Sequence, residues 1–585
     1  MTEVLNKNPA EEAAEKAMKE IFKCLSQSES FLLEAGAGAG KTYSLIQALK
    51  YLVKERGESL ISKGQKIACI TYTNVACDEI KNRVDGHPAV LASTIHAFCW
   101  SIIKDFQSQL WEELLHIERW AEMIAESNIR NKIKIEYDLG YRSVDSEKIS
   151  LGHDDVVSLT AKFMNYDKFI KILSSRYPVL FIDEYQDSDK DFIDSILTHI
   201  IDKKEQTLVG FFGDGWQKIY GNGSGSIENS NITYIDKHAN FRSENAIVEA
   251  LNKIRPDLKQ AIKDPHSTGS VNVYHTNGWK GERQKGSHWK GDLPTEVAQR
   301  ALEKVRLHLK EEWDFKPKKT KILMLTNNVL AREQGYSGIA NVFRRSEDYL
   351  KKGNPYIDFF VSTLEPLSIA FENSRYGDMF KVLDRRSAII QSTNDKTEWY
   401  EAMSSLIQLR ATGTIGEVVS HLKDTRRPRL SAIMEKMEKK LEQYNPTCEE
   451  EKVSSMERIK QLKKVPYQEV VELARYIEEK TPFSTKHGVK GAEFENVLVV
   501  FGRGWNHYDF NRFLEYSVDI EKISIDQKDF YERNRNLFYV AVSRPMRRLT
   551  LLFTQELSND SLSKLSEWFG DDNIYSMGDS ILDEN

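Results

Sequence analysis

The stretch FLLEAGAGAGKT, residues Phe31 to Thr42, joins a short apolar run to a glycine-rich loop that ends in lysine and threonine. Glycines let the backbone turn its N–H groups toward an anion, the lysine adds a positive charge, and the threonine hydroxyl suits magnesium. The usual phosphate-binding pattern, G-x-x-x-x-G-K-[ST], has glycine where this chain has Ala35. The stretch therefore predicts a strand, a nucleotide-binding loop and a helix, with one alanine that the rest of the chain must explain.

The sequence on both sides of this loop alternates apolar runs with helical periodicity. Further strand-like runs are QKIACITYT (65–73), YPVLFIDE (177–184), QTLVGFFGD (206–214), KILMLTNN (321–328), ENVLVVFG (495–502) and RLTLLFT (548–554). This alternation predicts an α/β fold with parallel sheets, in which loops at the strand C-termini carry the chemistry. Mainly helical stretches near 100–176 and 345–480 interrupt it, so the pattern occurs twice, each time with a helical insert.

Two carboxylates follow the apolar run at 177–184. Asp183 stands at the end of the predicted strand, where a second magnesium contact is needed, and Glu184 is placed to orient an attacking water. An acidic pair after a strand is by itself more often a solvated loop. Together with the upstream phosphate loop, it predicts hydrolysis of a nucleoside triphosphate.

The bulk composition excludes several classes of protein. At 585 residues the chain needs several packed units, and its net charge of −6 argues against wholesale coating of nucleic acid. The five cysteines show no C-x-x-C pairs, and neither a secretory signal nor a membrane-spanning apolar run is visible. We expect a protein of the reducing cytoplasm that has no membrane partner.

Eight motifs resemble, in order and approximate spacing, those of the UvrD/Rep-like superfamily 1 DNA helicases. They are AGAGAGKT, TYTNVACDEIKNR, STIHAF, DEYQD, GDGWQKIYG, NFRS, TKHGVKGAEF and NLFYVAVSR, and they span roughly Phe31 to Arg548. Members of that family often begin the phosphate loop with alanine, which accounts for Ala35. The resemblance implies two RecA-like parallel-sheet motor domains, each with a mainly helical insertion.

The resemblance and the alternation pattern together imply a division of the chain. The expected boundaries are 1–96 and 173–250 for the first RecA-like motor domain, 97–172 for its helical insertion, 251–345 and 481–556 for the second RecA-like motor domain, 346–480 for a helical accessory insertion, and 557–585 for an acidic C-terminal tail. We expect that tail to form a short helix or to be partly disordered.

The resemblance also implies a site for ATP and Mg²⁺. The implied nucleotide-binding residues are Ala35, Gly36, Ala37, Gly38, Ala39, Gly40, Lys41, Thr42, Tyr43, Phe241 and Glu493. Tyr43 and Phe241 would sandwich the adenine, and Glu493 would contact the ribose. Thr42 and Asp183 would hold the metal.

The implied catalytic residues lie in five of the motifs. They are Lys41, Asp183, Glu184, Gln217, Arg242 and Arg544. Gln217 would sense the γ-phosphate, and the two arginines would reach it from either side of the cleft, because a planar guanidinium suits the charge that spreads in the transition state.

A track for single-stranded DNA needs aromatic platforms for bases and donors for phosphates. The resemblance places it at Thr71, Tyr72, Thr73, Asn74, His96, Phe98, Tyr220 and His487. One stacking tryptophan that the family carries shortly after IYG is missing, and Trp216 either substitutes for it or simply packs. A glutamine that the family uses upstream to recognise adenine is also missing, so a preference for ATP is less secure than hydrolysis itself.

The segment His275–Asp292 is basic and glycine-rich and contains Trp279 and Trp289. Two interpretations remain open for it: a DNA-binding loop or a mobile, solvated hairpin. The sequence does not decide between them.

The sequence supports two hypotheses, which belong to different classes of protein function. The first is an ATP-driven motor that moves along single-stranded DNA, 3′ to 5′ as the family does, and unwinds duplex DNA with a single-stranded tail. The second is a DNA-sensing regulatory ATPase that controls a partner nuclease, because the chain resembles in size and domain content the UvrD-like partners of OLD-family nucleases in Gabija-type phage defence. A nucleotide-binding scaffold without catalysis is disfavoured, since all the implied catalytic residues are present.

Overall fold

The structure is a computed structural model. It describes residues 8–127, 129, 131–137, 142–219, 221–324, 326–343, 345–383, 390, 392–443, 455–485, 491–502 and 508–579.

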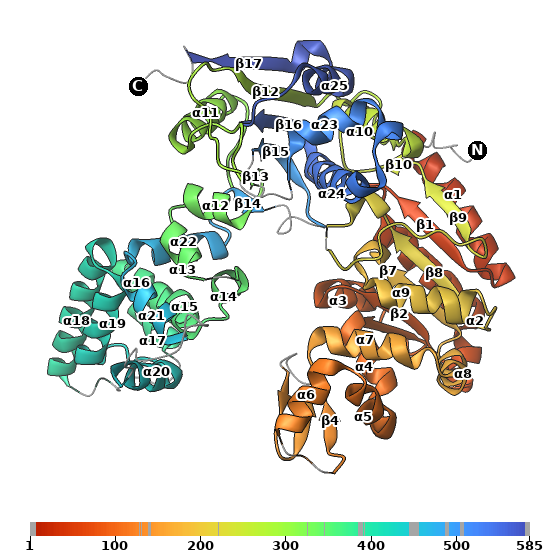
Figure 1. Ribbon diagram of the computed structural model, residues 1–585, viewed down its shortest axis with the longest axis horizontal. Coiled ribbons are helices and arrows are strands. Elements are labelled where there is room, and N and C mark those ends of the chain that lie inside the picture. The colour runs from red at the N-terminus through yellow and green to blue at the C-terminus, as the bar shows by residue number, and fades with distance from the viewer. Residues whose placement is uncertain are drawn as a thin grey trace, which may run out of the picture.

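Six parallel strands form the first sheet, in the spatial order β3-β2-β7-β8-β1-β9 (Figure 1). Their bounds are β1 Phe31–Ala35, β2 Ile67–Thr71, β3 Val90–Thr94, β7 Val179–Asp183, β8 Leu208–Gly213 and β9 Thr233–Lys237. The helices around them are α1 Pro9–Gln27, α2 Lys41–Ser62, α3 Asn74–Arg83 and α9 Lys190–Ile196. Alternate residues of β2 belong to two separate apolar clusters, Ile67 and Cys69 to one and Ala68 and Ile70 to the other. The sheet is therefore buried on both faces, as parallel sheets are.

The first insertion joins helices to a small sheet. It contains α4 Ile95–Ile103, α5 Gln107–Leu115, α6 Glu118–Glu126, α7 His153–Phe163 and α8 Asp167–Arg176, with the short strands β4 Lys134–Glu136, β5 Ser143–Val144 and β6 Lys148–Ser150 in the order β4-β6-β5. The expectation of a mainly helical insertion omitted this sheet. The boundary expected at 96/97 also cuts α4, because that helix starts directly at the end of β3 and continues into the insertion.

The second sheet again has six parallel strands, in the order β14-β13-β15-β16-β12-β17. Its elements are β12 Ser270–Gly278, β13 Thr320–Met324, β14 Phe483–Thr485, β15 Phe494–Phe501, β16 Pro545–Phe553 and β17 Ile574–Gly578, with α10 Asn245–Ile254, α11 Thr295–Leu309, α23 Phe510–Val518, α24 Ile525–Val542 and α25 Asn559–Phe569. The short strands β10 Ala239–Asn240 and β11 Ala261–Ile262 pair beside the connection between the two units. Two sheets of parallel strands confirm the predicted α/β class with two RecA-like domains.

Helix α10 shows that the second unit begins before the expected boundary at 250/251. Its apolar residues Ile247, Leu251 and Ile254 are buried in the same cluster as Val271 of β12. A boundary at 250 would split this helix, which packs on the second sheet.

Of the two alternatives expected for the acidic tail at 557–585, a short helix or partial disorder, the described residues show a helix, which is packed on the second unit and followed by a strand. Leu565, Trp568 and Phe569 lie at helical spacing on α25 and are buried in the core of the second unit. After them, β17 pairs in parallel with β12, and the rings of Tyr575 and Tyr274 stack at 5.1 Å. The described part of this region is an edge strand and a packed helix, because its apolar residues match both periodicities while its acids stay outside.

The accessory insertion is helical, as predicted. Its helices are α12 Asn327–Glu333, α13 Ser337–Val342, α14 Glu347–Leu350, α15 Pro355–Phe359, α16 Glu365–Glu372, α17 Tyr376–Val382, α18 Thr393–Thr412, α19 Ile415–Thr425, α20 Ala432–Glu442, α21 Ser455–Lys463 and α22 Gln468–Ile477. Its core already includes Tyr336 and Ile339, so it starts before the expected residue 346. Within it, Arg410 makes a buried two-point ion pair with Glu365, at 2.9 and 2.6 Å.

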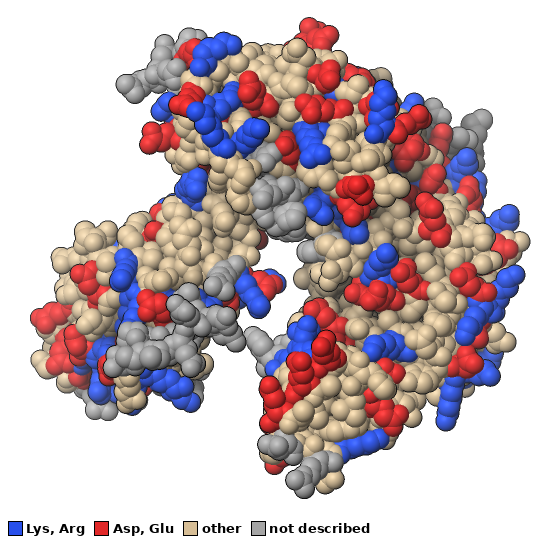
Figure 2. Space-filling model, in the orientation of Figure 1, with Lys and Arg blue, Asp and Glu red and all other residues tan. Residues whose placement is uncertain are grey.

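The two sheet units lie against each other, with α24 at their junction, whereas the accessory helices form a separate lobe at the lower left of Figure 1. Figure 2 shows an open hollow between this lobe and the first insertion. The C-terminal ends of β1, β7 and β8 therefore meet the second unit, and this junction holds most of the predicted site.

Candidate functional site

The glycine-rich loop closes between the end of β1 and the start of α2. Gly38 and Gly40 both have φ of 74°, the left-handed conformation that glycine adopts without strain. Gly40 precedes α2 and makes no side-chain cap, so the first N–H groups of α2 are left for a ligand. Lys41 Nζ donates to the carbonyl oxygen of Ala35 at 3.3 Å, which holds the ammonium group against the loop. This is the geometry of an anion site at a helix N-terminus.

Side chains from outside the loop clamp its middle. Gln260 Nε2 and Asn240 Nδ2 donate to the carbonyl oxygen of Ala37, at 3.1 and 3.3 Å. The Ala37 N–H in turn donates to the hydroxyl of Tyr539, at 3.4 Å. Tyr539 belongs to α24, so the second unit touches the phosphate loop of the first directly. Asn240 and Tyr539 stand inside the motifs NFRS and NLFYVAVSR but were given no role from the sequence, and Gln260 lies outside every motif.

Asp183 is the last residue of β7 and Glu184 follows it, as predicted. Asp183 is 7% exposed; burial and the Glu184 carboxylate raise its pKa to about 7, against a lowering by nearby Lys41. Glu184 has a left-handed φ of 50°, its N–H donates to Asp183 Oδ1 at 3.1 Å, and its Oε2 accepts a hydrogen bond from Gln186 at 2.6 Å. Burial and the neighbouring carboxylate disfavour uncompensated negative charge at Asp183, and a divalent cation would relieve this by binding the ionised carboxylate. Carboxylate and hydroxyl oxygens are ligands that Mg²⁺ takes, so the residue types of Asp183 and Thr42 fit this ion.

Gln217 and Arg544 meet across the junction of the two units. Gln217 lies in the short turn η3 (Gly215–Gln217) after β8, and Arg544 follows α24. Arg544 Nη2 donates to Gln217 Oε1 at 3.0 Å, and its Nε donates to the carbonyl oxygen of Val540 at 3.0 Å. Burial and the neighbouring Arg242 lower the pKa of Arg544 to about 9. Negative charge that enters the site would therefore stabilise the charged form of Arg544.

Arg242 and Glu493, both predicted at the nucleotide, pair with each other in this structure. Arg242 Nε donates to Glu493 Oε2 at 3.0 Å, and its Nη1 donates to the carbonyl oxygen of Ser543 at 3.1 Å. The ion pair is partly exposed, so its partners can exchange for a ligand at modest cost.

Tyr43 and Phe241 flank Gly40. Side-chain atoms of both residues come within 3.8 Å of a methyl group placed on this glycine. Tyr43 is 56% exposed, which leaves one of its faces open. The contacts are to Tyr43 Cβ and Phe241 Cδ2, so both residues lie beside this end of the loop, and their role at the adenine stays a prediction.

Lys237, which sequence analysis did not single out, is fully buried under the loop at the end of β9. Its Nζ donates to the carbonyl oxygen of Gly40 at 3.0 Å and to Ser44 Oγ at 2.7 Å. Burial, with a contribution from Lys41, lowers its pKa to about 8. The two-residue alternation of β9 was the available signal, because it places Lys237 on the same buried face as Ile235.

The predicted DNA-contacting residues after β2 are accessible. Tyr72 is 44% exposed, and Thr73 and Asn74 are exposed beside it. Thr73 also begins α3, since its hydroxyl accepts the Ala76 N–H at 3.2 Å. Burial raises the pKa of Tyr72 while Lys351 of the accessory lobe lowers it, so Tyr72 lies on the side of the first unit that faces this lobe.

Two other predicted DNA contacts are buried in the structure. Phe98 is 1% exposed and packs edge-on against Tyr177 at 5.4 Å, and Thr71 is 3% exposed. Phe98 and His96 are two residues apart on one helix, so their side chains point in nearly opposite directions. His96 is half-buried and its ring lies 4.9 Å from that of His153. The prediction for Phe98 as a base platform and for Thr71 as a phosphate donor is wrong for this conformation. Tyr220 and His487 lie outside the described residues.

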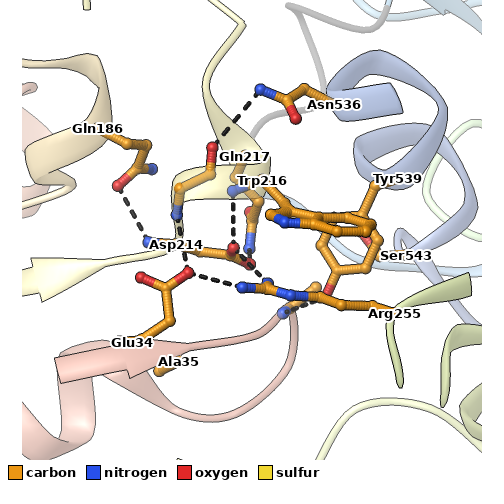
Figure 3. A network of polar contacts seen from close by, with 12 residues as sticks. Glu34, Ala35, Gln186, Asp214, Trp216, Gln217, Arg255, Asn536, Tyr539 and Ser543 are labelled. Atoms are coloured by element: carbon orange, nitrogen blue, oxygen red, sulfur yellow. Dashed lines mark hydrogen bonds and ion pairs between the residues drawn. The ribbon is translucent and has the colours of Figure 1, made fainter. Parts of the chain in front are cut away.

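Trp216 packs and does not present a free face. The guanidinium groups of Arg255 and Arg535 lie 4.9 and 4.2 Å from its ring centroid. The ring also meets Tyr539 edge-on at 5.6 Å, and Figure 3 shows it beside Arg255 and Tyr539. Of the two interpretations for this residue, the structure supports packing.

The segment His275–Asp292 is held on the second unit. Trp279 is 8% exposed, and Arg283 donates to the carbonyl oxygens of Thr276, at 2.6 Å, and Thr554, at 3.1 Å. Trp289 is half-buried under the guanidinium of Arg332, at 5.2 Å. Its two tryptophans therefore anchor the segment and are not free DNA platforms, although its lysines remain exposed.

None of the helices in the described ranges is both long and apolar enough to cross a membrane.

Comparison with known proteins finds similarity both for part of the chain that includes the first unit and for nearly the whole chain. A family model described as an AAA domain matches residues 18–222. The chain is 27% identical, over 719 aligned positions, to the Gabija protein GajB of Bacillus cereus (strain HuB5-5), covering 98% of this chain and 99% of that protein. It is 25% identical to the ATP-dependent DNA helicase PcrA of Staphylococcus aureus (strain Mu50), over 38% of this chain and 37% of PcrA. The PcrA of Staphylococcus epidermidis is 26% identical over the same shares.

Proposed function

We propose that this chain, which belongs to the UvrD/Rep-like superfamily 1 DNA helicases, couples ATP hydrolysis at the junction of its two sheet units to movement along single-stranded DNA. The movement would run 3′ to 5′, and the substrate would be duplex DNA with a single-stranded tail. The cytoplasm, where the buried thiols of the described residues stay reduced, is the location that goes with this proposal.

In the proposed reaction, the loop N–H groups and Lys41 bind the phosphates of ATP. Thr42 and Asp183 would hold Mg²⁺, which, when bound, neutralises charge on the β- and γ-phosphates. Glu184 accepts a proton from the attacking water, and its hydrogen bond from Gln186 keeps the carboxylate oriented.

The second unit supplies the arginine that completes the site. As charge spreads over the γ-phosphate, Arg544 exchanges part of its contact with Gln217 for the phosphate oxygens, and Arg242 does the same from its pair with Glu493. Loss of the γ-phosphate would return both arginines to their protein partners and loosen the junction. Exposed Tyr72, Thr73 and Asn74 would grip the DNA while this cycle runs.

The observation that carries the proposal is the 3.0 Å contact between Arg544 and Gln217. It joins the two sheet units through the two residues that are implied to respond to the γ-phosphate. Hydrolysis and relative movement of the units would then act on the same hydrogen bond.

The test measures ATP turnover with and without single-stranded DNA for the wild type, Lys41→Ala and Glu184→Gln, together with unwinding of 3′-tailed and 5′-tailed duplexes. We expect DNA-stimulated turnover in the wild type, loss in both variants, and unwinding of the 3′-tailed duplex. A wild type that hydrolyses no ATP in the presence of DNA would overturn the motor proposal, and unwinding of only the 5′-tailed duplex would overturn the polarity.

A second candidate is favoured by the similarity to GajB, which extends over nearly the whole of both chains. In that proposal the ATPase cycle senses DNA and controls a partner nuclease of the OLD family in phage defence. ATP turnover without unwinding of either tailed duplex would support it. DNA cleavage by the partner that is unchanged by this chain, with and without ATP, would refute it.

A further inference from the structure

Arg255 occupies a buried position between the phosphate loop and the turn that carries Gln217. It follows α10, its side chain is 4% exposed, and its two Nη atoms contact two carboxylates at once (Figure 3), while its Nε lies 3.5 Å from the exposed carboxylate of Asp257. Its Nη1 donates to Asp214 Oδ1 at 2.6 Å, and its Nη2 donates to Glu34 Oε1 at 2.7 Å. Glu34 lies on β1, one residue before Ala35, and Asp214 follows β8. No motif of the family resemblance contains Arg255.

Asp214 connects this arginine to both sides of the proposed reaction. Its Oδ2 accepts a hydrogen bond from Gln217 Nε2 at 2.7 Å, and Gln217 then accepts one from Arg544. The Asp214 N–H donates to Gln186 Oε1 at 3.1 Å, and the amide group of Gln186 donates to Glu184. One carboxylate residue therefore sets the orientation of the γ-phosphate sensor and, through one amide, of the proposed general base.

The charge of Arg255 keeps Asp214 in place. Burial alone would raise the pKa of Asp214, but Arg255 and Lys41 outweigh it and lower that pKa. Without the guanidinium, two buried carboxylates would face each other, and such a pair separates, takes up a proton or admits water. Each of these changes would turn Asp214 away from Gln217.

Glu34 ties the same arginine to the loop strand. Its Oε2 accepts from the Tyr185 hydroxyl at 2.6 Å and its Oε1 from the Gly215 N–H at 3.0 Å. The ring of Trp216, from the sensor turn, lies 4.9 Å from the guanidinium, and the ring of Tyr539, from α24 of the second unit, lies 5.6 Å from it. Arg255 is thus in contact with the loop strand, the sensor turn and helix α24.

We propose that Arg255 is a positioning residue for the hydrolysis step, holding Asp214 so that Gln217 and Glu184 are both aligned when ATP is bound. This inference rests on the proposed ATPase function. Because Arg255 contacts neither the phosphate loop amides nor Lys41, it would act on turnover and leave nucleotide affinity nearly unchanged.

Arg410 provides a matched control. It is also a buried arginine, 8% exposed at its side chain, with a two-point contact to a buried carboxylate, but it lies in the accessory lobe. Arg255→Lys and Arg410→Lys both replace a two-point contact by a single charge, so both are expected to lower the melting temperature. Only Arg255→Lys is expected to disturb the proposed ATPase site.

The experiment measures kcat and KM for ATP with saturating single-stranded DNA, alongside melting temperatures, for the wild type, Arg255→Lys, Arg410→Lys and Glu34→Gln. We expect Arg255→Lys to lower kcat at least tenfold with KM within about threefold, and Arg410→Lys to leave both within twofold. Glu34→Gln keeps an oxygen acceptor and leaves the Asp214 contact in place, so we expect a smaller loss, about threefold in kcat.

Wild-type turnover by folded Arg255→Lys overturns the inference, as does a loss that appears entirely in KM. If Arg255→Lys is unfolded at the assay temperature, Glu34→Gln decides, and an unchanged kcat in that variant overturns the inference as well. An inactive wild type would instead refute the proposed function, so the two failures are distinguishable.

Discussion

Binding of ATP should draw a proton onto Lys237. This lysine is fully buried beneath the phosphate loop, hydrogen-bonded to Gly40 and Ser44, and its pKa is lowered from the ordinary 10.5 to about 8. Above pH 8 the free protein therefore holds Lys237 mostly neutral. A bound triphosphate adds negative charge on the other side of the loop, which favours the charged form.

The size of the effect follows from that pKa. Magnesium-bound ATP carries a net charge of about −2, and at ~10 Å with an effective dielectric constant of about 20 it attracts an ammonium group by about 3 kcal/mol. This attraction raises the pKa of Lys237 by about two, since each unit corresponds to about 1.4 kcal/mol. With a starting pKa of about 8, Lys237 should take up about 0.7 proton on binding at pH 8.5 but only about 0.1 at pH 7.

Because binding takes up a proton, the direction in which nucleotide affinity changes with pH is also determined. Binding that takes up a proton weakens as pH rises, so nucleotide affinity should fall about fivefold between pH 8 and pH 9. Asp183, whose pKa is about 7, is already ionised in this range and does not obscure the effect.

The assay is calorimetric titration with a non-hydrolysable ATP analogue and Mg²⁺ at pH 8.5, in two buffers of different ionisation enthalpy. Lys237→Met should abolish most of the uptake, whereas Lys50→Met, which changes an exposed lysine on helix α2, the helix that follows the loop, should leave it intact. Equal uptake in the wild type and Lys237→Met would refute the reasoning, and so would a wild type with no uptake at pH 8.5.

Three further predictions test other parts of the structure. Arg544→Lys should lower kcat for ATP on the order of 100-fold or more with little change in KM, because a lysine loses the fork that reaches both Gln217 and the phosphate; an unchanged kcat in steady-state assays with DNA would contradict this. Phe98→Ala should cost about 3–5 kcal/mol of stability as a buried aromatic in the insertion core, whereas Tyr72→Ala should weaken single-stranded DNA binding by about 1–3 kcal/mol at an unchanged melting temperature; oligonucleotide anisotropy and thermal melts separate the two, and the reverse pattern would refute the assignment. Ending the chain after Gly570 removes β17 and exposes an edge of β12, so that variant should melt lower and aggregate in size-exclusion chromatography, and a monomer as stable as the wild type would show that β17 is dispensable.

The loop, the strands and their carboxylates were predictable because each signal is local. A buried apolar strand that ends in Asp183 and a glycine loop that ends in Lys41 can be recognised without tertiary contacts, and the parallel order of the strands then brings their ends together. The contact between Gln217 and Arg544 was implied only by family resemblance, since 327 residues separate the two in sequence.

The wrong predictions concerned the direction in which a side chain points and the partners against which a segment packs, and a sequence motif encodes neither. Phe98 was assigned with His96 although one helix cannot turn both toward the same ligand. The C-terminal acids suggested a tail, but the apolar positions between them match a helix and an edge strand. Arg255 and Lys237 belong to no motif: the alternation of β9 was a weak signal for Lys237, and Arg255 is identified by its burial next to charged partners in the folded chain.

The contacts that cover the phosphate loop limit which substitutions the loop can accept. A methyl group on Gly36 would lie 2.7 Å from Gln260 Nε2 and 3.1 Å from the Tyr539 hydroxyl, and one on Gly38 would lie 2.7 Å from Arg242 Cβ. These neighbours come from far downstream, one of them from the second unit. The loop therefore cannot be exchanged independently of the residues that cover it. Among relatives, positions 36 and 38 should covary with 240, 242, 260 and 539. A loop transferred from a distant helicase should function only when its covering residues are transferred with it.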